Sequence, residues 1–158
     1  MATPTYTLID STVLGSSASS VTFSSITQDY RDLVFVIEPS NTASGGSIAN
    51  TFNSDTTDAN YYYVRMKGDG SSTSSNNSNS RFIGFTGYSG SKALVEFTIL
   101  DYSATDKHKS YLSRYSIGTA EVAAVAGRWA NTSAITQVTF EGTTFNSGST
   151  FYLYGIAS

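Results

Sequence analysis

The sequence has no cysteine, one histidine, two prolines and few charged side chains, which make up 13% of its 158 residues. Without cysteine, disulfides, thiolate metal sites and cysteine nucleophiles are excluded. No apolar run approaches the roughly 20 residues that cross a bilayer, so we expect no membrane partner. The net charge of −3 and the pI near 4.9 oppose binding to a phosphate backbone, and we expect no nucleic-acid partner.

The few chemically active side chains form no recognisable catalytic set. The single histidine, His108, is flanked by lysines in an expected turn and is predicted to lie on the surface. Among the carboxylates, Glu96 and Asp101 share one candidate strand but point to opposite faces, and Glu121 and Glu141 have no evident partner. Since no nucleophile, base or acid pair can be named, we predict that the protein is not an enzyme and needs no cofactor.

One oxygen-rich segment could in principle hold a hard cation such as calcium. Asn53, Asp55, Asp58 and Asn60 lie within eight residues, and carboxylate and amide oxygens are the ligands that calcium prefers. The spacing differs from that of the twelve-residue calcium loop, and Asx side chains also cap turns. We therefore favour turn chemistry, with a weak cation site as the alternative, and predict no metal centre.

What is abundant is hydroxyl, aromatic and β-branched residues, and these alternate with period two along most of the chain. This pattern predicts an all-β protein, a single-domain antiparallel β-sandwich over residues 1–158. The stronger candidate strands span residues 21–25, 33–37, 61–67, 81–86, 93–102, 109–117, 134–141 and 150–156, and the weaker ones 6–14 and 47–52. Residues 119–127 fit a strand or a two-turn helix, and we favour the strand.

The longest polar segment is Gly68 to Ser80, which contains no apolar residue. Such a segment cannot bury itself, so we predict an exposed loop. It is either a solvated hairpin tip or a loop that reaches a neighbouring subunit or a ligand. Asp69, near its beginning, is the candidate contact residue.

Two aromatic segments offer candidate contact residues. In the strand that begins at Tyr61, alternation places Tyr61, Tyr63 and Arg65 on one face, and tyrosine and arginine are enriched at interfaces. Arg128, beside the only tryptophan, invites the same interpretation. Ordinary packing in the core and between strands is the alternative for both segments.

Several segments taken together resemble a family of small virion proteins of tailed bacteriophages. They are VTFSSI from residue 21, YRDLVFV from residue 30, FNSDTTDANY from residue 52, RWANTSAI from residue 128 and the final YLYGI from residue 152. The resemblance covers about Leu8 to Ile156, and its motifs are structural rather than catalytic.

The resemblance implies a jelly-roll-like fold and a structural role in the virion. It implies a capsid decoration or cement protein that binds and stabilises the assembled shell, with the major capsid protein or another virion protein as partner. It also implies a homo-oligomer, with a trimer favoured. A sequence that starts with Met and shows no signal-peptide pattern suggests synthesis in the host cytoplasm. The alternatives are a tail or fibre accessory module, or a carbohydrate-binding sandwich for surface glycans.

Overall fold

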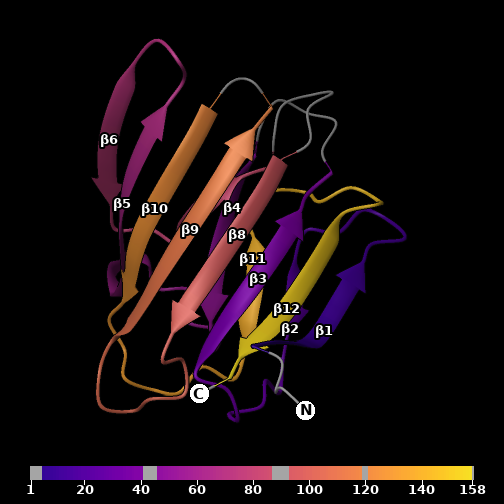
Figure 1. Ribbon diagram of the computed structural model, residues 1–158, viewed down its shortest axis with the longest axis vertical. Coiled ribbons are helices and arrows are strands. Elements are labelled where there is room, and N and C mark those ends of the chain that lie inside the picture. Colours follow the sequence, from indigo (N-terminus) through magenta and orange to yellow (C-terminus); the bar gives the residue numbers. More distant parts are fainter. Residues whose placement is uncertain (1–4, 41–45, 87–92, 119–120, 158) are drawn as a thin grey trace.

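The chain forms antiparallel strands in a computed structural model that describes residues 5–40, 46–86, 93–118 and 121–157 (Figure 1). The strands are β1 (Tyr6–Val13), β2 (Val21–Phe23), β3 (Asp32–Glu38), β4 (Ser47–Phe52), β5 (Tyr61–Gly68), β6 (Thr73–Ser78), β7 (Phe82–Phe85), β8 (Ala93–Leu100), β9 (Lys109–Ile117), β10 (Glu121–Trp129), β11 (Val138–Glu141) and β12 (Thr150–Ile156). A single 3-10 turn, η1 (Asp58–Asn60), is the one helical element in the described ranges, so none of their helices could cross a membrane.

The strands make two sheets that pack face to face. The large sheet has the order β1-β12-β3-β8-β9-β10-β5-β6, and the small sheet has the order β2-β11-β4-β7. Eight of these strands obey a simple rule, because β1 pairs with β12, β2 with β11, β3 with β8 and β4 with β7. Early strands thus pair with late ones, as in a long hairpin rolled across two sheets. This pairing is that of a jelly roll, and it confirms the predicted fold class.

The remaining four strands are additions to one side of the roll. β5 and β6 follow β4 in the chain, and β9 and β10 follow β8, yet both pairs join the large sheet beside β8. The large sheet is therefore twice as wide in strands as the small one, and β6 forms its far edge (Figure 1).

An aromatic core fills the space between the sheets. The ring of Phe35 on β3 lies 5.5 Å from that of Phe23 and 5.1 Å from that of Phe140, both on the small sheet. Phe52 on β4 contacts the rings of Trp129 and Tyr111 from the added strands at 5.4 and 6.0 Å. Edge-to-face and tilted ring contacts of this kind join the two layers.

The predicted strands all occur, and 47–52, 109–117 and 150–156 have the predicted bounds. β10 confirms a strand rather than a helix where the sequence left both open, from Glu121 onward; residues 119–120 lie outside the described ranges. The predicted loop of residues 68–80 is wrong in part. It is exposed over residues 69–79, but Thr73–Ser78 forms the edge strand β6.

Candidate functional site

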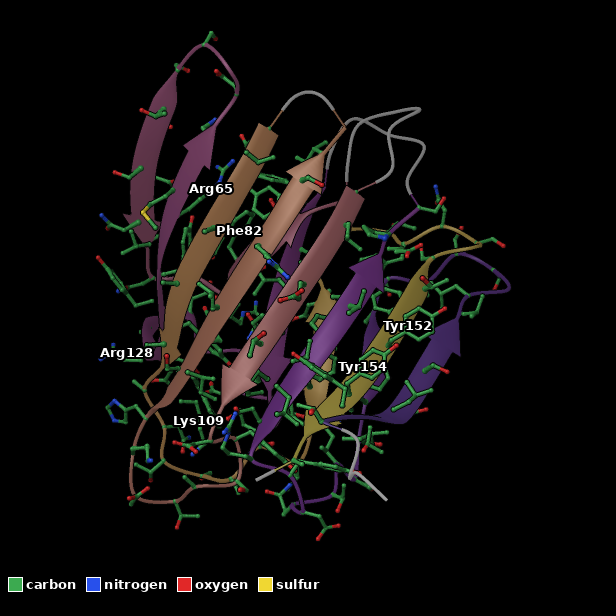
Figure 2. All side chains as sticks on the ribbon, in the orientation of Figure 1. Arg65, Phe82, Lys109, Arg128, Tyr152 and Tyr154 are labelled. Atoms are coloured by element: carbon green, nitrogen blue, oxygen red, sulfur yellow. The ribbon has the colours of Figure 1, made fainter. Side chains whose placement is uncertain are left out.

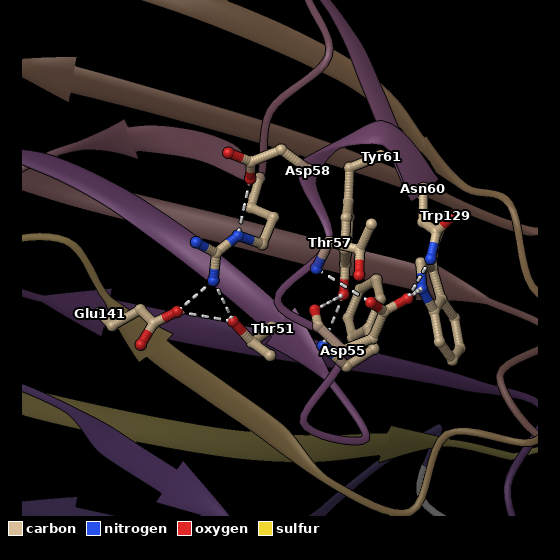
Figure 3. Close-up of polar contacts among 10 residues, drawn as sticks. Thr51, Asp55, Thr57, Asp58, Asn60, Tyr61, Trp129 and Glu141 are labelled. Carbon is tan, nitrogen blue, oxygen red and sulfur yellow. Dashed lines mark hydrogen bonds and ion pairs between the residues drawn. The ribbon is translucent and has the colours of Figure 1, made fainter.

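Two of the predicted contact residues, Tyr61 and Tyr63, point inward. Tyr61 is fully buried and Tyr63 is 8% exposed. The hydroxyl of Tyr61 accepts a hydrogen bond from the backbone N–H of Phe52 at 3.0 Å and donates one to the carbonyl of Asp55 at 2.9 Å (Figure 3). Burial raises its pKa to about 12. The expectation of a contact face here is wrong, because this side of β5 packs against the small sheet.

Arg65 lies on the same inner face and serves the core. Its guanidinium sits over the rings of Phe85, Phe82 and Tyr115, at 5.1, 5.6 and 5.7 Å from their centroids. It also forms an ion pair with Glu121 of β10, and Glu121 forms a second ion pair with Lys67 at 3.1 Å. This cluster ties β5 and β10 to β7, and it corrects the expectation that Arg65 is an interface or ligand contact.

Asp69 and Arg128 are exposed, as a contact role would require. Asp69 forms the turn between β5 and β6, where its carboxylate accepts hydrogen bonds from the N–H groups of Ser71 and Ser72 at 2.9 and 2.7 Å. These bonds lower the pKa of Asp69. Arg128 lies at the end of β10 opposite Tyr62, on the outer face of the large sheet (Figure 2).

The oxygen-rich segment of residues 53–60 is used by the fold itself (Figure 3). Asp55 accepts hydrogen bonds from Trp129 Nε1 and Asn60 Nδ2, both at 2.8 Å, and from the Thr57 N–H at 3.0 Å. Desolvation opposes ionisation, but these bonds outweigh it and lower the pKa of Asp55. Asp58 pairs with Arg81 at 3.0 Å. Within the described ranges no three His, Cys, Asp or Glu residues gather in a metal-binding geometry, and the favoured turn interpretation agrees with these contacts.

Two further carboxylates considered in the sequence, Glu141 and Glu96, are each paired with a basic residue. Glu141 pairs with Arg81 and accepts a hydrogen bond from Thr51 at 2.7 Å. Glu96 pairs with Arg114 across β8 and β9 at 2.5 Å. His108 is exposed beside a turn, as predicted.

A buried charge that the sequence analysis did not identify is Lys109 at the start of β9. It is 1% exposed, and its ammonium group donates to the backbone carbonyls of Ala104, Lys107 and Thr132. Burial lowers its pKa. The lysine joins two loops at one end of the sandwich, so its role is structural.

The surface feature that stands out is the outer face of the large sheet. Among the described residues, all the large hydrophobic side chains that remain exposed lie on this face. They are Tyr6, Leu8, Val13, Tyr62, Val64, Met66, Leu94, Leu100, Leu112 and Val122. One row of cross-strand neighbours runs over seven strands, and only Tyr154 and Thr98 in it carry a hydroxyl: Leu8, Tyr154, Val34, Thr98, Leu112, Ala126 and Val64.

The outer face of the small sheet is polar by contrast. Thr22 and Thr139 share a hydrogen bond at 2.9 Å on neighbouring strands, and Thr51 bonds to Glu141. Arg81 bonds to both Thr51 and Glu141 there (Figure 3). The sandwich therefore has one face suited to water and one face with exposed apolar surface, and contiguous exposed apolar surface marks interaction sites.

The apolar face has two parts with different chemistry. The aliphatic patch lies on β8, β9, β10 and β5 and consists of Val64, Met66, Leu94, Leu100, Leu112 and Val122. The tyrosine groove, a hollow of about 320 Å³, lies toward β1 and is lined by Tyr6, Val34, Val36, Glu96, Arg114 and Tyr154. A further hollow of about 800 Å³ lies between β10, β5 and β6, at the side of the patch.

Comparisons with known proteins add little to this geometry. No family model matches the chain, and no curated protein matches it. Among solved structures, a galectin of Caenorhabditis elegans, LEC-6, is similar over 94% of this chain and 96% of its own, with 9% identity and a TM-score of 0.37. A likeness at that level bears on neither the ligand nor the role of this protein.

Proposed function

We propose that the protein is a structural component of a tailed-bacteriophage particle, a decoration protein that binds the assembled shell through the aliphatic patch. The resemblance of the sequence to virion proteins over residues 8–156 supports a place on the phage particle. The concentration of exposed apolar side chains on one sheet face supports binding by contact rather than by catalysis. A tail or fibre accessory module would use the same face, and the position of the protein on the particle distinguishes the two roles.

The carrying observation is the difference between the two outer faces. Met66 and Leu112 are 55% and 52% exposed and Val122 is 62% exposed, while the opposite sheet presents threonines and ion pairs. Each buried square ångström of apolar surface contributes about 25 cal/mol to association, so a partner that covers the patch gains from it. Binding to the assembled shell but not to its free subunits would stabilise the shell by mass action.

The first experiment asks whether the protein is on the particle. Mass spectrometry and electron microscopy of purified virions should find many copies at regular positions on the head. Its absence from purified virions would end the proposal, and density on the tail alone would assign it the accessory role. Mass photometry of the isolated protein tests the expected trimer.

The second experiment tests the face. Shells that lack the protein are incubated with wild type, with Leu112→Glu or with Thr22→Glu, and binding is measured by co-sedimentation. Leu112→Glu places a charge in the patch and should weaken binding at least tenfold. Thr22→Glu adds the same charge to the exposed face of the small sheet and should bind like wild type. Equal binding by the two variants would remove the patch from the interface.

A further inference from the structure

The tyrosine groove has a composition different from that of the aliphatic patch beside it. Its floor is Val34, which is 6% exposed, and Val36 lies next to it on β3. Tyr6 from β1, 57% exposed, and Tyr154 from β12 line the groove. Tyr154 is itself fixed by stacking on Tyr152, with the ring centroids 6.4 Å apart and 30° between the planes (Figure 2). The groove thus offers aromatic surface above an apolar floor.

The polar side of the groove is an ion pair. Arg114 Nη2 donates to Glu96 Oε2 at 2.5 Å, and the side chains of the two residues remain 72% and 35% exposed. The guanidinium keeps N–H donors beyond this bond, and the carboxylate keeps acceptor positions. A ligand in the groove therefore meets donors and acceptors side by side, next to aromatic rings.

The charges of the groove select against an anion. The positive charge of Arg114 is balanced by Glu96, and the whole chain carries a net charge of −3. A phosphate or carboxylate ligand would meet no uncompensated cation among the groove residues. The fitting ligand is neutral, has an apolar face for the rings and carries both donors and acceptors at its edge. A pyranose ring has this combination, with C–H groups on its face and hydroxyls around it.

We propose that the tyrosine groove binds a neutral saccharide. Tyr6 and Tyr154 contact the C–H face of the sugar, while Arg114 donates to one hydroxyl and Glu96 accepts from its neighbour. The volume of about 320 Å³ lies at the lower end of the range for ligand pockets, which suits one or two sugar rings. This inference goes beyond the proposed function and is independent of it, because it concerns the isolated protein.

The test uses the full chain on an array of neutral oligosaccharides, followed by titration calorimetry with the best binder. Wild type should bind at least one neutral oligosaccharide, and Tyr6→Ala and Tyr154→Ala should each weaken that binding at least tenfold. Tyr62→Ala is the matched control, since Tyr62 is an exposed tyrosine of the same sheet outside the groove, 37% exposed on β5. Circular dichroism and thermal melts of each variant establish that the fold is retained, and Tyr6 on the edge strand serves if Tyr154→Ala unfolds.

Two results would overturn the inference. One is the failure of wild type to bind any neutral glycan on the array. The other is a loss of binding in Tyr62→Ala as large as in Tyr6→Ala, which would place the sugar elsewhere on the sheet. Loss of shell binding in Leu112→Glu with sugar binding intact would leave both proposals standing on their own evidence.

Glu96→Gln tests the role of the ion pair. The amide keeps an acceptor but removes the negative charge, so Arg114 becomes an uncompensated cation. The variant should shift preference at least fivefold from neutral sugars toward acidic ones, such as uronates. An unchanged preference between neutral and acidic sugars would show that the ion pair does not contact the sugar. It would contradict the proposed role of Arg114 and Glu96 in recognition.

Discussion

At the scale of single residues, Asn50 fits its surroundings least. This asparagine lies on β4 and is fully buried. Among the described residues, neither its side-chain amide oxygen nor its side-chain amide nitrogen has a hydrogen-bond partner. A buried polar group without a partner costs about 1–3 kcal/mol. We therefore expect Asn50→Leu, of similar size, to raise the free energy of unfolding by about 1–3 kcal/mol in urea denaturation.

The control for Asn50 is an exposed asparagine. Asn77→Leu changes the same side chain on β6, where the residue is exposed, and should alter stability by less than about 0.5 kcal/mol. A destabilised Asn50→Leu with an unchanged Asn77→Leu would mean that the amide at position 50 has a partner in solution, such as a trapped water.

Glu121 should make the stability of the protein depend on pH. Desolvation raises the pKa of this carboxyl, but hydrogen bonds from Tyr115, Arg65 and Lys67 outweigh it, so the pKa in the folded state lies below the ordinary value of 4.5. The stabilisation by the ionised form is complete above that value and is lost as the pH falls through the folded-state pKa. We expect the free energy of unfolding to decrease as the pH falls below about 4.5.

Glu121→Gln should reduce this pH dependence and lower stability at pH 7 by about 1–3 kcal/mol, because Arg65 then loses its charged partner. Chemical denaturation between pH 3 and pH 7 measures both effects. Glu38→Gln removes an exposed carboxylate at the end of β3 and should keep the wild-type pH profile. A Glu121→Gln profile equal to that of wild type would show that the cluster does not control acid stability.

At the scale of elements, β10 depends on a glycine in its middle. Gly127 is the direct cross-strand neighbour of Tyr111, and a methyl group at position 127 would overlap the Tyr111 ring. Replacing a glycine by alanine usually stabilises a strand, but at position 127 the added methyl group forces the Tyr111 ring to move. We expect Gly127→Ala to lower the free energy of unfolding by about 1–3 kcal/mol.

Gly15→Ala is the matched control for Gly127→Ala. No atom lies within 4 Å of a methyl group at that position, so its effect should stay within about 0.5 kcal/mol. Thermal and urea unfolding of the two variants compares them. Equal free energies of unfolding for the two variants would mean that the Tyr111 ring can move away from position 127 without loss of packing.

The strands also show what alternation can and cannot predict. It correctly places Tyr61, Tyr63 and Arg65 on one face of β5, but the period of two is the same whichever face is buried. The choice is made by partners far away in the sequence, such as Trp129 and Glu121, which the pattern does not identify. β6 was missed for a related reason. Its residues Thr73–Ser78 are all exposed and carry no hydrophobic signal, and the pairing with β5 supplies the strand.

At the scale of the whole molecule, the two outer faces should differ in measurable hydrophobicity. The exposed apolar side chains of the described residues gather on the large sheet, so this face should dominate retention on a phenyl column. We expect Leu112→Glu to elute clearly earlier in a falling salt gradient than wild type. Thr22→Glu, with the same added charge on the small sheet, should elute close to wild type; equal shifts would contradict the asymmetry.

The fold class and nearly all strands follow from the sequence because each strand carries its own alternation. The apolar outer face of the large sheet does not follow, because it exists only after eight strands are placed side by side. Leu8, Val34, Leu112 and Val64 are far apart in the chain and read singly as ordinary strand residues. Their common face is a property of strand order, which local patterns do not encode.

The position of β12 has a consequence for how the chain acquires its structure. β12 is synthesised after the other strands of the described residues, yet it fills the place between β1 and β3, where residues 150–156 pair with both. While these residues are still in the ribosome, β1 has no neighbour and β3 has one bare edge. The roll therefore closes only after translation reaches residue 156, whereas the neighbouring pairs β5–β6 and β9–β10 need only short loops and can form earlier.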